Sequence, residues 1–235
     1  MTAESHTFLF ADLAGFTALT EAHGDSDAAD LVGEFFADVR SLLARHGAEE
    51  IKTIGDALMI RCERADSAIA LALAVVAEVG QRTGLPSVRV GINTGPAVER
   101  DGDWFGSAVN VAARISAAAT GGQVLLSRAT AEAAGASGPD RASLDLPGHD
   151  EVRLVERGRR ELRNVSEAVV LYEASCQSSR SAQGLAIDPV CRMSVDPAYA
   201  AGVLRHAGVE YHFCSLACAE RFAAAPERYA ADAIP

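Results

Sequence analysis

Lysine is almost absent from this sequence, and positive charge is scarce overall. Lys52 is the only lysine, and the 21 basic residues are outnumbered by 32 acidic ones, which gives a formal net charge of −11. No part of the sequence gathers arginines into the basic stripe that binding to a phosphodiester backbone requires. The sequence therefore predicts no nucleic-acid partner.

Long apolar runs are also missing. The most apolar stretch, residues 68–79 (AIALALAVVAEV), is flanked by charged residues. It is shorter than the roughly 20 residues that cross a bilayer, so it predicts a buried helix over residues 66–80 and no membrane association. The first residues carry no cationic leader, and five cysteines in 235 residues are too few for a disulfide-bonded scaffold. We therefore expect a cytoplasmic protein.

The chain divides into two parts of unequal size. Residues 1–175 alternate strand and helix patterns, residues 176–185 are small and polar like a linker, and residues 186–235 carry three of the five cysteines. The order strand, helix, helix, hairpin, helix, strand predicts an α+β fold. We expect a ferredoxin-like split βαβ core, with a mostly antiparallel sheet and flanking helices, followed by a small cysteine-containing domain.

An amphipathic helix is predicted after residue 24. Apolar residues recur at the helical period from Leu31 to Leu43, with Asp25 or Ser26 as the expected N-cap and Gly47 as the stop signal. A helix with one apolar stripe must cover another layer, which agrees with the α+β architecture.

Two aspartates stand where strands are predicted to end. Asp12 ends the alternating pattern HTFLFADLA, and Asp56 follows Gly55 in a predicted two-residue II′ hairpin turn. Carboxylates from separate strand ends can converge at one sheet edge, and nucleotide enzymes hold Mg²⁺ or Mn²⁺ with one or two of them. Alternatively, Asp12 only caps the next helix and Asp56 only fills a turn. Gly15 opens that helix, whose free backbone N–H groups suit phosphate oxygens.

Three segments together resemble the signature blocks of class III nucleotidyl cyclases. They read FADLAGFT, IKTIGDALM and DWFGSAVNVAARI, and with a closing LRNVSEAVVLYEA the resemblance spans residues 5–175. It implies an adenylate cyclase that converts ATP into 3′,5′-cyclic AMP and pyrophosphate. It also implies a homodimer with sites at the subunit interface and two Mg²⁺ or Mn²⁺ ions per site, in which the ribose 3′-hydroxyl attacks the α-phosphate.

The same resemblance implies a role for individual residues of these blocks. The implied positions are Asp12, Leu13 and Asp56 for metal binding; Lys52 and Asp103 for the base; Asn110 and Arg114 for the transition state; and Gly15, Phe16, Thr17 and Arg163 for other substrate contacts. A lysine is usual at the Arg163 position in the family, and three nearby arginines are alternatives: Arg157, Arg159 and Arg160.

Lys52 and Asp103 are complementary to adenine rather than to guanine. Adenine presents an acceptor at N1 and a donor at its 6-amino group, which an ammonium and a carboxylate match, whereas guanine presents the opposite pair. ATP is therefore the expected substrate. Two other functions stay open: a guanylate or dual-specificity cyclase, and a catalytically silent nucleotide-binding module that senses metal or redox state.

The C-terminal part contains Cys191, Cys214 and Cys218, and it resembles a YHS domain over residues 186–231 through DPVCRMSVDP, EYHFCSLAC and RFAAAPERY. Three thiolates suit Zn²⁺ or Cu(I), and the expected fourth ligand is His206 or His212. Alternatively, these cysteines are small buried residues of a compact module that binds a protein partner. We expect this tail to regulate or localise the enzyme.

Overall fold

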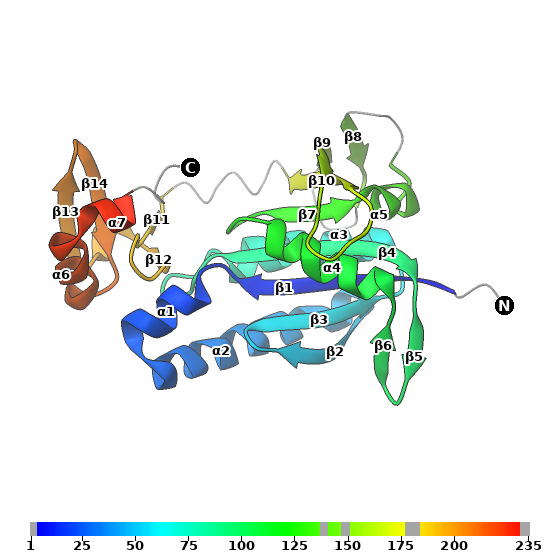
Figure 1. The fold of residues 1–235 in the computed structure, drawn as a ribbon, viewed down its shortest axis with the longest axis horizontal. Coiled ribbons are helices and arrows are strands. Elements are labelled where there is room, and N and C mark those ends of the chain that lie inside the picture. The colour runs from blue at the N-terminus through cyan, green and yellow to red at the C-terminus, as the bar shows by residue number, and fades with distance from the viewer. Residues whose placement is uncertain (1–3, 137–140, 147–150, 177–183, 231–235) are drawn as a thin grey trace.

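The computed structural model describes residues 4–136, 141–146, 151–176 and 184–230. An eight-stranded sheet with helices on both faces forms the larger part, and a small tail lies at one end beside α1 (Figure 1). The elements of the larger part are β1 (Ser5–Leu13), α1 (Phe16–His23), α2 (Asp25–Leu43), η1 (Ala44–His46), β2 (Ala48–Ile54), β3 (Ala57–Cys62), α3 (Ala65–Ala74), η2 (Val75–Val79), β4 (Val88–Pro96), β5 (Val98–Arg100), β6 (Asp103–Phe105), α4 (Ser107–Ala118), β7 (Val124–Ser127), α5 (Arg128–Ala133), β8 (Arg141–Leu144), β9 (Val152–Arg160) and β10 (Val169–Cys176). Those of the tail are β11 (Ala186–Ile187), β12 (Ser194–Val195), η4 (Pro197–Tyr199), β13 (Gly202–His206), β14 (Val209–Phe213), α6 (Leu216–Ala224) and α7 (Pro226–Ala230).

The sheet is built around β1. The strand order is β2-β3-β1-β4-β7-β10-β9-β8, and among these described strands only β4 and β7 pair in parallel. The first four strands, with helices between β1 and β2 and between β3 and β4, form the predicted ferredoxin-like split βαβ core. The prediction of an α+β fold with a mostly antiparallel sheet is therefore confirmed.

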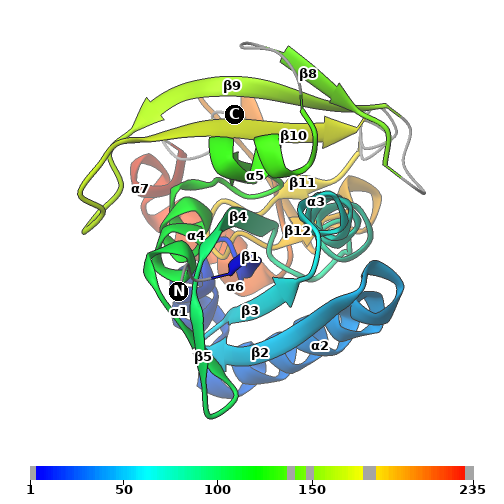
Figure 2. The same cartoon turned by 90° about the vertical axis from the view of Figure 1, so that its right-hand side faces the viewer.

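Alternation along β1 divides its side chains between two cores. Leu9 and Leu13 pack in the cluster that α2 and α3 supply, whereas Phe8 and Phe10 pack against α4. Figure 2 shows α2 and α3 on one side of the sheet and α4 on the other. Asp12 has the same parity as Phe10, so it lies on the α4 face, close to the end of the strand.

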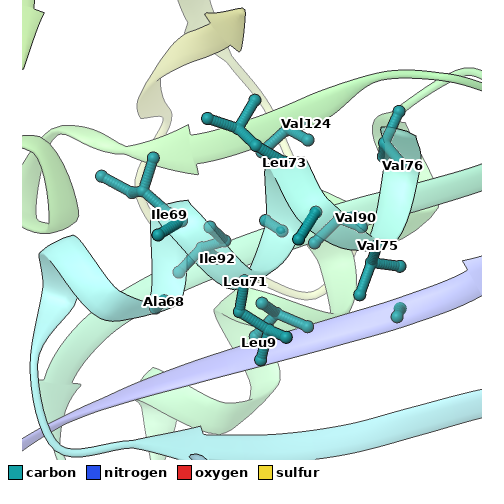
Figure 3. Packing of buried hydrophobic residues seen from close by; sticks show 14 of the residues in the cluster. Leu9, Ala68, Ile69, Leu71, Leu73, Val75, Val76, Val90, Ile92 and Val124 are labelled. Atoms are coloured by element: carbon teal, nitrogen blue, oxygen red, sulfur yellow. The ribbon is translucent and has the colours of Figure 1, made fainter. Parts of the chain in front are cut away.

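The apolar helix α3 is buried on all sides. Ile69, Leu71 and Leu73 share one cluster with residues of β1, β4 and β7 (Figure 3). The predicted helix over residues 66–80 is confirmed in its place, but its last turn, Val75–Val79, is a π-helix, in which the Gly80 N–H donates to the Val75 carbonyl. A helix without a polar face belongs inside the molecule, which explains this position.

The junction between α1 and α2 differs from the prediction. The N-cap of α2 is Gly24, with φ 88° and ψ 166°, and Asp25 is the first helical residue rather than the cap. One residue must reverse the chain here, and glycine adopts this backbone without a steric penalty. At the other end, Gly47 has φ 57° and ends the helical segment as predicted.

The predicted hairpin turn at Gly55 and Asp56 is present. Ile54 pairs with Ala57 across the turn, and Gly55 has φ 63° while Asp56 keeps a negative φ, as a II′ turn requires. Because Ala57 also pairs with Asp12, the tip of this hairpin lies beside the end of β1.

The tail packs against the larger part through α1. Leu19 of α1 lies in one buried cluster with Phe213 and Phe222 of the tail. Backbone hydrogen bonds also join Ser194 to residues 84–85, just before β4. The sequence pattern did not predict this contact between the two parts.

Two further expectations concern the chain as a whole. None of the described helices combines the length and the apolar character that a membrane crossing requires. Residues 177–183 of the predicted linker lie outside the described residues, and Cys176, where that linker was expected to begin, is the last residue of β10.

Candidate active site and metal cluster

The aspartates predicted to bind metal come together at one edge of the sheet. Asp12 lies near the end of β1, and Asp56 lies at the tip of the adjacent β2–β3 hairpin. Burial, together with a hydrogen bond from the protonated Asp56 side chain to the neighbouring Asp12 carboxylate, raises the pKa of Asp56 to about 7. The two carboxylates repel each other, and a bound cation would relieve that repulsion. The pair therefore has the ligand chemistry that Mg²⁺ and Mn²⁺ prefer.

Arg89 of β4 belongs to the same group. It lies opposite Asp12 in the β1–β4 register, and its Nε and Nη2 atoms donate to Oδ2 of Asp12 at 2.8 and 2.5 Å. The side chain of Asp12 is only 14% exposed, so this charged, two-pronged contact fixes the orientation of its carboxylate.

The loop after Asp12 leads directly into α1. Gly15 is the N-cap of α1 and has φ 87°, a conformation that glycine adopts easily. Leu13 is buried, Phe16 is partly buried and Thr17 is exposed. The first backbone N–H groups of α1 have no helical partner and lie next in sequence to the aspartate pair, which suits phosphate binding.

The residues predicted to read the base are in contact with each other. Lys52 Nζ lies 2.5 Å from Oδ2 of Asp103, and the two side chains are 39% and 29% exposed. The Lys52 ammonium, together with the Trp104 backbone N–H, holds the pKa of Asp103 below its usual range. The ion pair joins β2 to the β5–β6 hairpin, and enough of both side chains remains exposed to meet a ligand.

Asn110 and Arg114 lie one turn apart on the exposed side of α4. The opposite side of this helix carries Ala108 and Ala112, which are buried against β1. The two predicted transition-state residues therefore point away from the core of their own chain. No hydrogen bond links them to the aspartate pair within the described part of the chain.

Arg163 is exposed in the turn between β9 and β10. Its neighbour Leu162 is buried with Ile115 of α4, so this turn lies against the same helix as Asn110. The alternative candidate Arg157 is engaged elsewhere, because its Nε atom donates to Glu173 at 2.7 Å.

The three tail cysteines meet a histidine of the larger part. The Sγ atoms of Cys191 and Cys214 are 3.4 Å apart, and those of Cys214 and Cys218 are 3.7 Å apart. Nε2 of His23, the last residue of α1, lies 3.5 Å from Cys214 Sγ and 3.9 Å from Cys218 Sγ. All four ligand atoms lie within 4.8 Å of one another, and no second cluster of this kind occurs among the described residues.

Neither tail histidine expected as the fourth ligand lies beside the cysteines. His206 packs edge-on against the ring of Phe222, with 6.1 Å between the ring centroids. Nε2 of His212 lies 3.5 Å from Oε1 of Glu210 on the same strand. The β13–β14 hairpin carries both histidines, whereas the packing of α1 on the tail brings His23 to the thiols.

Residues 2–165 match the family model of the adenylate and guanylate cyclase catalytic domain. The chain belongs to this cyclase family. Residues 186–233 match the model of the YHS domain, so a cyclase domain is followed by a YHS domain, as the resemblance suggested.

Relatives of the cyclase domain include named enzymes. A pH-sensitive adenylate cyclase of Mycobacterium tuberculosis is 35% identical over 182 residues, which cover 77% of this chain and 43% of the relative. An adenylate cyclase of Streptomyces griseus is 34% identical over 158 residues, or 65% of this chain and 40% of the relative. The chain thus spans less than half the length of these curated relatives. A solved adenylate cyclase of Trypanosoma brucei, in its monomeric state, is 26% identical and superposes with a TM-score of 0.60 over 75% of this chain and 90% of that one.

Sequence reasoning missed two residues of the cyclase domain, Arg89 and His23. No local pattern indicates the role of Arg89, because only the register of β1 with β4 puts it opposite Asp12. His23 lies outside the signature blocks. The one signal for it was the odd number of YHS cysteines, since a tetrahedral site needs a fourth ligand.

Proposed function

We propose that the chain is an adenylate cyclase that converts ATP into 3′,5′-cyclic AMP and pyrophosphate. One observation carries this proposal: in a domain of the cyclase family, Asp12 meets Asp56 and Lys52 meets Asp103. A module that only binds a nucleotide does not need a pair of metal-binding carboxylates in addition to the residues that contact the base. The names of the relatives in Mycobacterium and Streptomyces support the same activity.

The carboxylates of Asp12 and Asp56, with the Leu13 backbone carbonyl, are the proposed ligands of two Mg²⁺ or Mn²⁺ ions. The raised pKa of Asp56 supports this assignment, because a cation relieves the repulsion between the carboxylates. When bound, the ions activate the ribose 3′-hydroxyl and neutralise the triphosphate. Arg89 keeps Asp12 oriented for this role.

Lys52 and Asp103 select the base. Lys52 donates a hydrogen bond to N1 of adenine, and Asp103 accepts one from the 6-amino group. Guanine leaves both groups without a matching partner, and an unmatched polar site rejects the wrong ligand strongly. The contact between the two side chains supports a shared role, since it presents a donor and an acceptor side by side.

The remaining predicted residues bind the phosphates. Arg114 donates to the α-phosphate oxygens as negative charge builds there, and one such donor typically lowers the barrier by about 3–4 kcal/mol. Asn110 acts from the same helix face. Further contacts to the triphosphate come from the Arg163 side chain and from the loop residues Gly15, Phe16 and Thr17.

The active form in this proposal is a homodimer. Ile54, Val98 and Phe105, on β2 and the β5–β6 hairpin, are more than half exposed, at 51%, 51% and 53%. Exposed apolar side chains around a site mark an interaction surface. The partner is a second copy of this chain, so that the aspartate pair of one subunit faces Asn110 and Arg114 of the other.

The decisive experiment measures cyclic AMP formation from ATP, with GTP as a competitor, in the presence of Mg²⁺ or Mn²⁺. We expect the double variant Lys52→Gln/Asp103→Asn to lose at least about tenfold in kcat/KM for ATP and most of its preference over GTP. Asp101→Asn, in the turn of the same β5–β6 hairpin, is the matched control and leaves both unchanged. Absence of cyclic AMP with either ion contradicts the proposal, and equal turnover of GTP by the unmodified chain contradicts the role of the base-reading pair.

The YHS domain is proposed to regulate the cyclase domain, because it packs directly on α1, the helix that follows the phosphate loop. Its free thiols and an ATP substrate fit the reducing cytoplasm, where we expect this activity.

A further inference from the structure

The four side chains of the interdomain cluster have the dimensions of a tetrahedral zinc site. With Zn–S bonds near 2.3 Å and Zn–N bonds near 2.0 Å, the ligand atoms of such a site lie about 3.8 Å apart for two sulfurs and about 3.5 Å apart for sulfur and nitrogen. Two of the three sulfur pairs measure 3.4 and 3.7 Å, and two of the three sulfur–nitrogen pairs measure 3.5 and 3.9 Å. The remaining two pairs lie within 4.8 Å. The sulfurs are also too far apart for a disulfide bond, since 3.4 Å far exceeds the S–S bond length of about 2.05 Å.

We propose that Cys191, Cys214 and Cys218 of the YHS domain bind one Zn²⁺ together with His23 of the cyclase domain. The ion then ties the two domains together. Three thiolates and one imidazole form a closed ligand set without a position for water, which is typical of structural rather than catalytic zinc. Zn²⁺ is favoured over harder ions because thiolates are soft ligands.

The groups behind the ligands hold them in place. Asp188 is fully buried, and its carboxylate accepts hydrogen bonds from the backbone N–H groups of Val190 at 2.8 Å and Cys214 at 2.9 Å. The Ser215 hydroxyl caps α6 by accepting from the Cys218 N–H at 3.2 Å. Such supporting contacts orient metal ligands before the ion arrives, so the cluster is a built site rather than a chance meeting of thiols.

The ion also connects to the phosphate loop. His23 ends α1, and Gly15 begins it. At the Gly15 end, Arg192, which follows the ligand Cys191, lies so close that a Cβ on Gly15 would meet its Cγ at 2.5 Å. Both ends of α1 therefore contact the YHS domain. If the proposed function is correct, zinc holds the loop from Gly15 to Thr17 in its substrate-binding position.

The first test measures metal binding by the full-length, reduced protein, independently of any cyclase activity. Zinc content and titration with Co²⁺, whose thiolate charge-transfer and tetrahedral visible bands report on the ligands, should give one equivalent per chain. We expect His23→Ala to weaken binding at least about tenfold. The variants His206→Gln and His212→Gln are matched controls that should bind like the unmodified chain. His23→Cys should restore tight binding with a fourth thiolate, which separates loss of a ligand from loss of the fold.

Two outcomes overturn the zinc site: wild-type affinity in His23→Ala, or loss of the metal in either tail-histidine variant. An Asp12→Asn/Asp56→Asn protein must keep the cobalt–thiolate signal, because its metal loss concerns a different site.

The second test measures cyclic AMP formation before and after zinc is removed with a chelator and then added back in stoichiometric amount. We expect removal to raise the KM for ATP several-fold, and readdition to reverse the change in the unmodified chain but not in His23→Ala. Unchanged kinetics after zinc removal overturn the link to the phosphate loop. A chain that binds one zinc but forms no cyclic nucleotide contradicts the proposed function and leaves the zinc site standing.

Discussion

Gly91 of β4 lies directly against the backbone of α4. A Cβ atom at this position would meet the backbone nitrogen of Ser116 at 2.0 Å. The helix that carries Asn110 and Arg114 can therefore pack this closely on β4 only because residue 91 has no side chain. We expect Gly91→Ala to lower the free energy of unfolding by about 1–3 kcal/mol or more, because the packed helix must shift. Chemical denaturation measures this change.

Gly95→Ala is the control, because Gly95 lies on the same strand and a Cβ there would meet only the Ala108 methyl group, at 3.2 Å. Its effect should be clearly smaller. Equal stability of the two variants would show that the contact between β4 and α4 adapts freely, contrary to this prediction.

Single residues could be paired from the sequence where they stand in a signature-like block. The resemblance to the cyclase family paired Asp12 with Asp56 and Lys52 with Asp103, and the structure brings both pairs into contact. Arg89 could not be assigned a partner from the sequence, because its contact with Asp12 exists only through strand register. The same holds for the histidine beside the cysteines. Sequence proximity favoured His206 and His212 of the tail, whereas the packing of α1 on the tail brings His23 there.

At the scale of elements, the ion pair between Arg40 and Glu50 joins α2 to β2. Arg40 donates to both carboxylate oxygens of Glu50, at 2.6 and 2.8 Å, and this hydrogen bonding lowers the pKa of Glu50. A carboxyl with a lowered pKa in the folded chain stabilises the fold above its unfolded pKa, and this contribution is lost as the pH falls through the folded value.

We therefore expect Glu50→Gln to lower the free energy of unfolding near neutral pH by up to about 1 kcal/mol, the range of partly exposed ion pairs. The difference from the unmodified chain should disappear in acid. Denaturant unfolding over a series of pH values checks both statements, with Glu63→Gln, an exposed glutamate just after β3, as the control. A constant difference at every pH would contradict the ion-pair explanation.

Long helices with a repeating apolar pattern were predictable, whereas short elements and the junctions between elements were not. The stripe of α2 and the apolar run of α3 gave both helices, because periodicity accumulates over several turns. α5 has six residues, too few to show a period, and it was not predicted. The π-helical end of α3 and the cap at Gly24 depend on how neighbouring elements meet, so no local pattern indicates them.

At the scale of the whole molecule, a shared active site predicts complementation between damaged subunits. Asp12→Asn and Arg114→Ala proteins should each be nearly inactive, because each lacks one half of every site. Mixing them in equal amounts should restore up to about a quarter of wild-type activity, since half of the randomly formed dimers contain one intact site of two. Cyclic AMP assays with subunit exchange verified by mass spectrometry measure this, and exchange without rescue contradicts the shared site.

Removal of the YHS domain should destabilise the cyclase domain. Leu19 and Ala28 are 0% and 1% exposed in the full chain, because tail residues cover them. A chain ending at residue 176 exposes this apolar surface, so we expect a lower melting temperature and a tendency to aggregate. An unchanged melting temperature of the truncated chain would contradict this prediction.

The variant Cys191→Ser/Cys214→Ser keeps the tail residues that cover α1, so it is the better test of regulation. It should lose bound metal.

The split βαβ core of the sheet followed from the order of strand and helix patterns, because that order leaves few ways to connect such a core. The positions of β7, β10, β9 and β8 in the sheet were not predicted. The docking of the YHS domain on α1 could not be predicted. It joins segments that are far apart in the sequence, and the sequence of neither segment indicates the other as its partner.

Helix α1 contributes to the interior of two domains at once. An attempt to graft this tail onto another cyclase must therefore transplant the apolar residues of α1 and the start of α2 with it, along with His23. The unit to exchange between such proteins is therefore the tail together with α1. A fusion that is cut at residue 176 divides the residues of one shared hydrophobic core between two proteins.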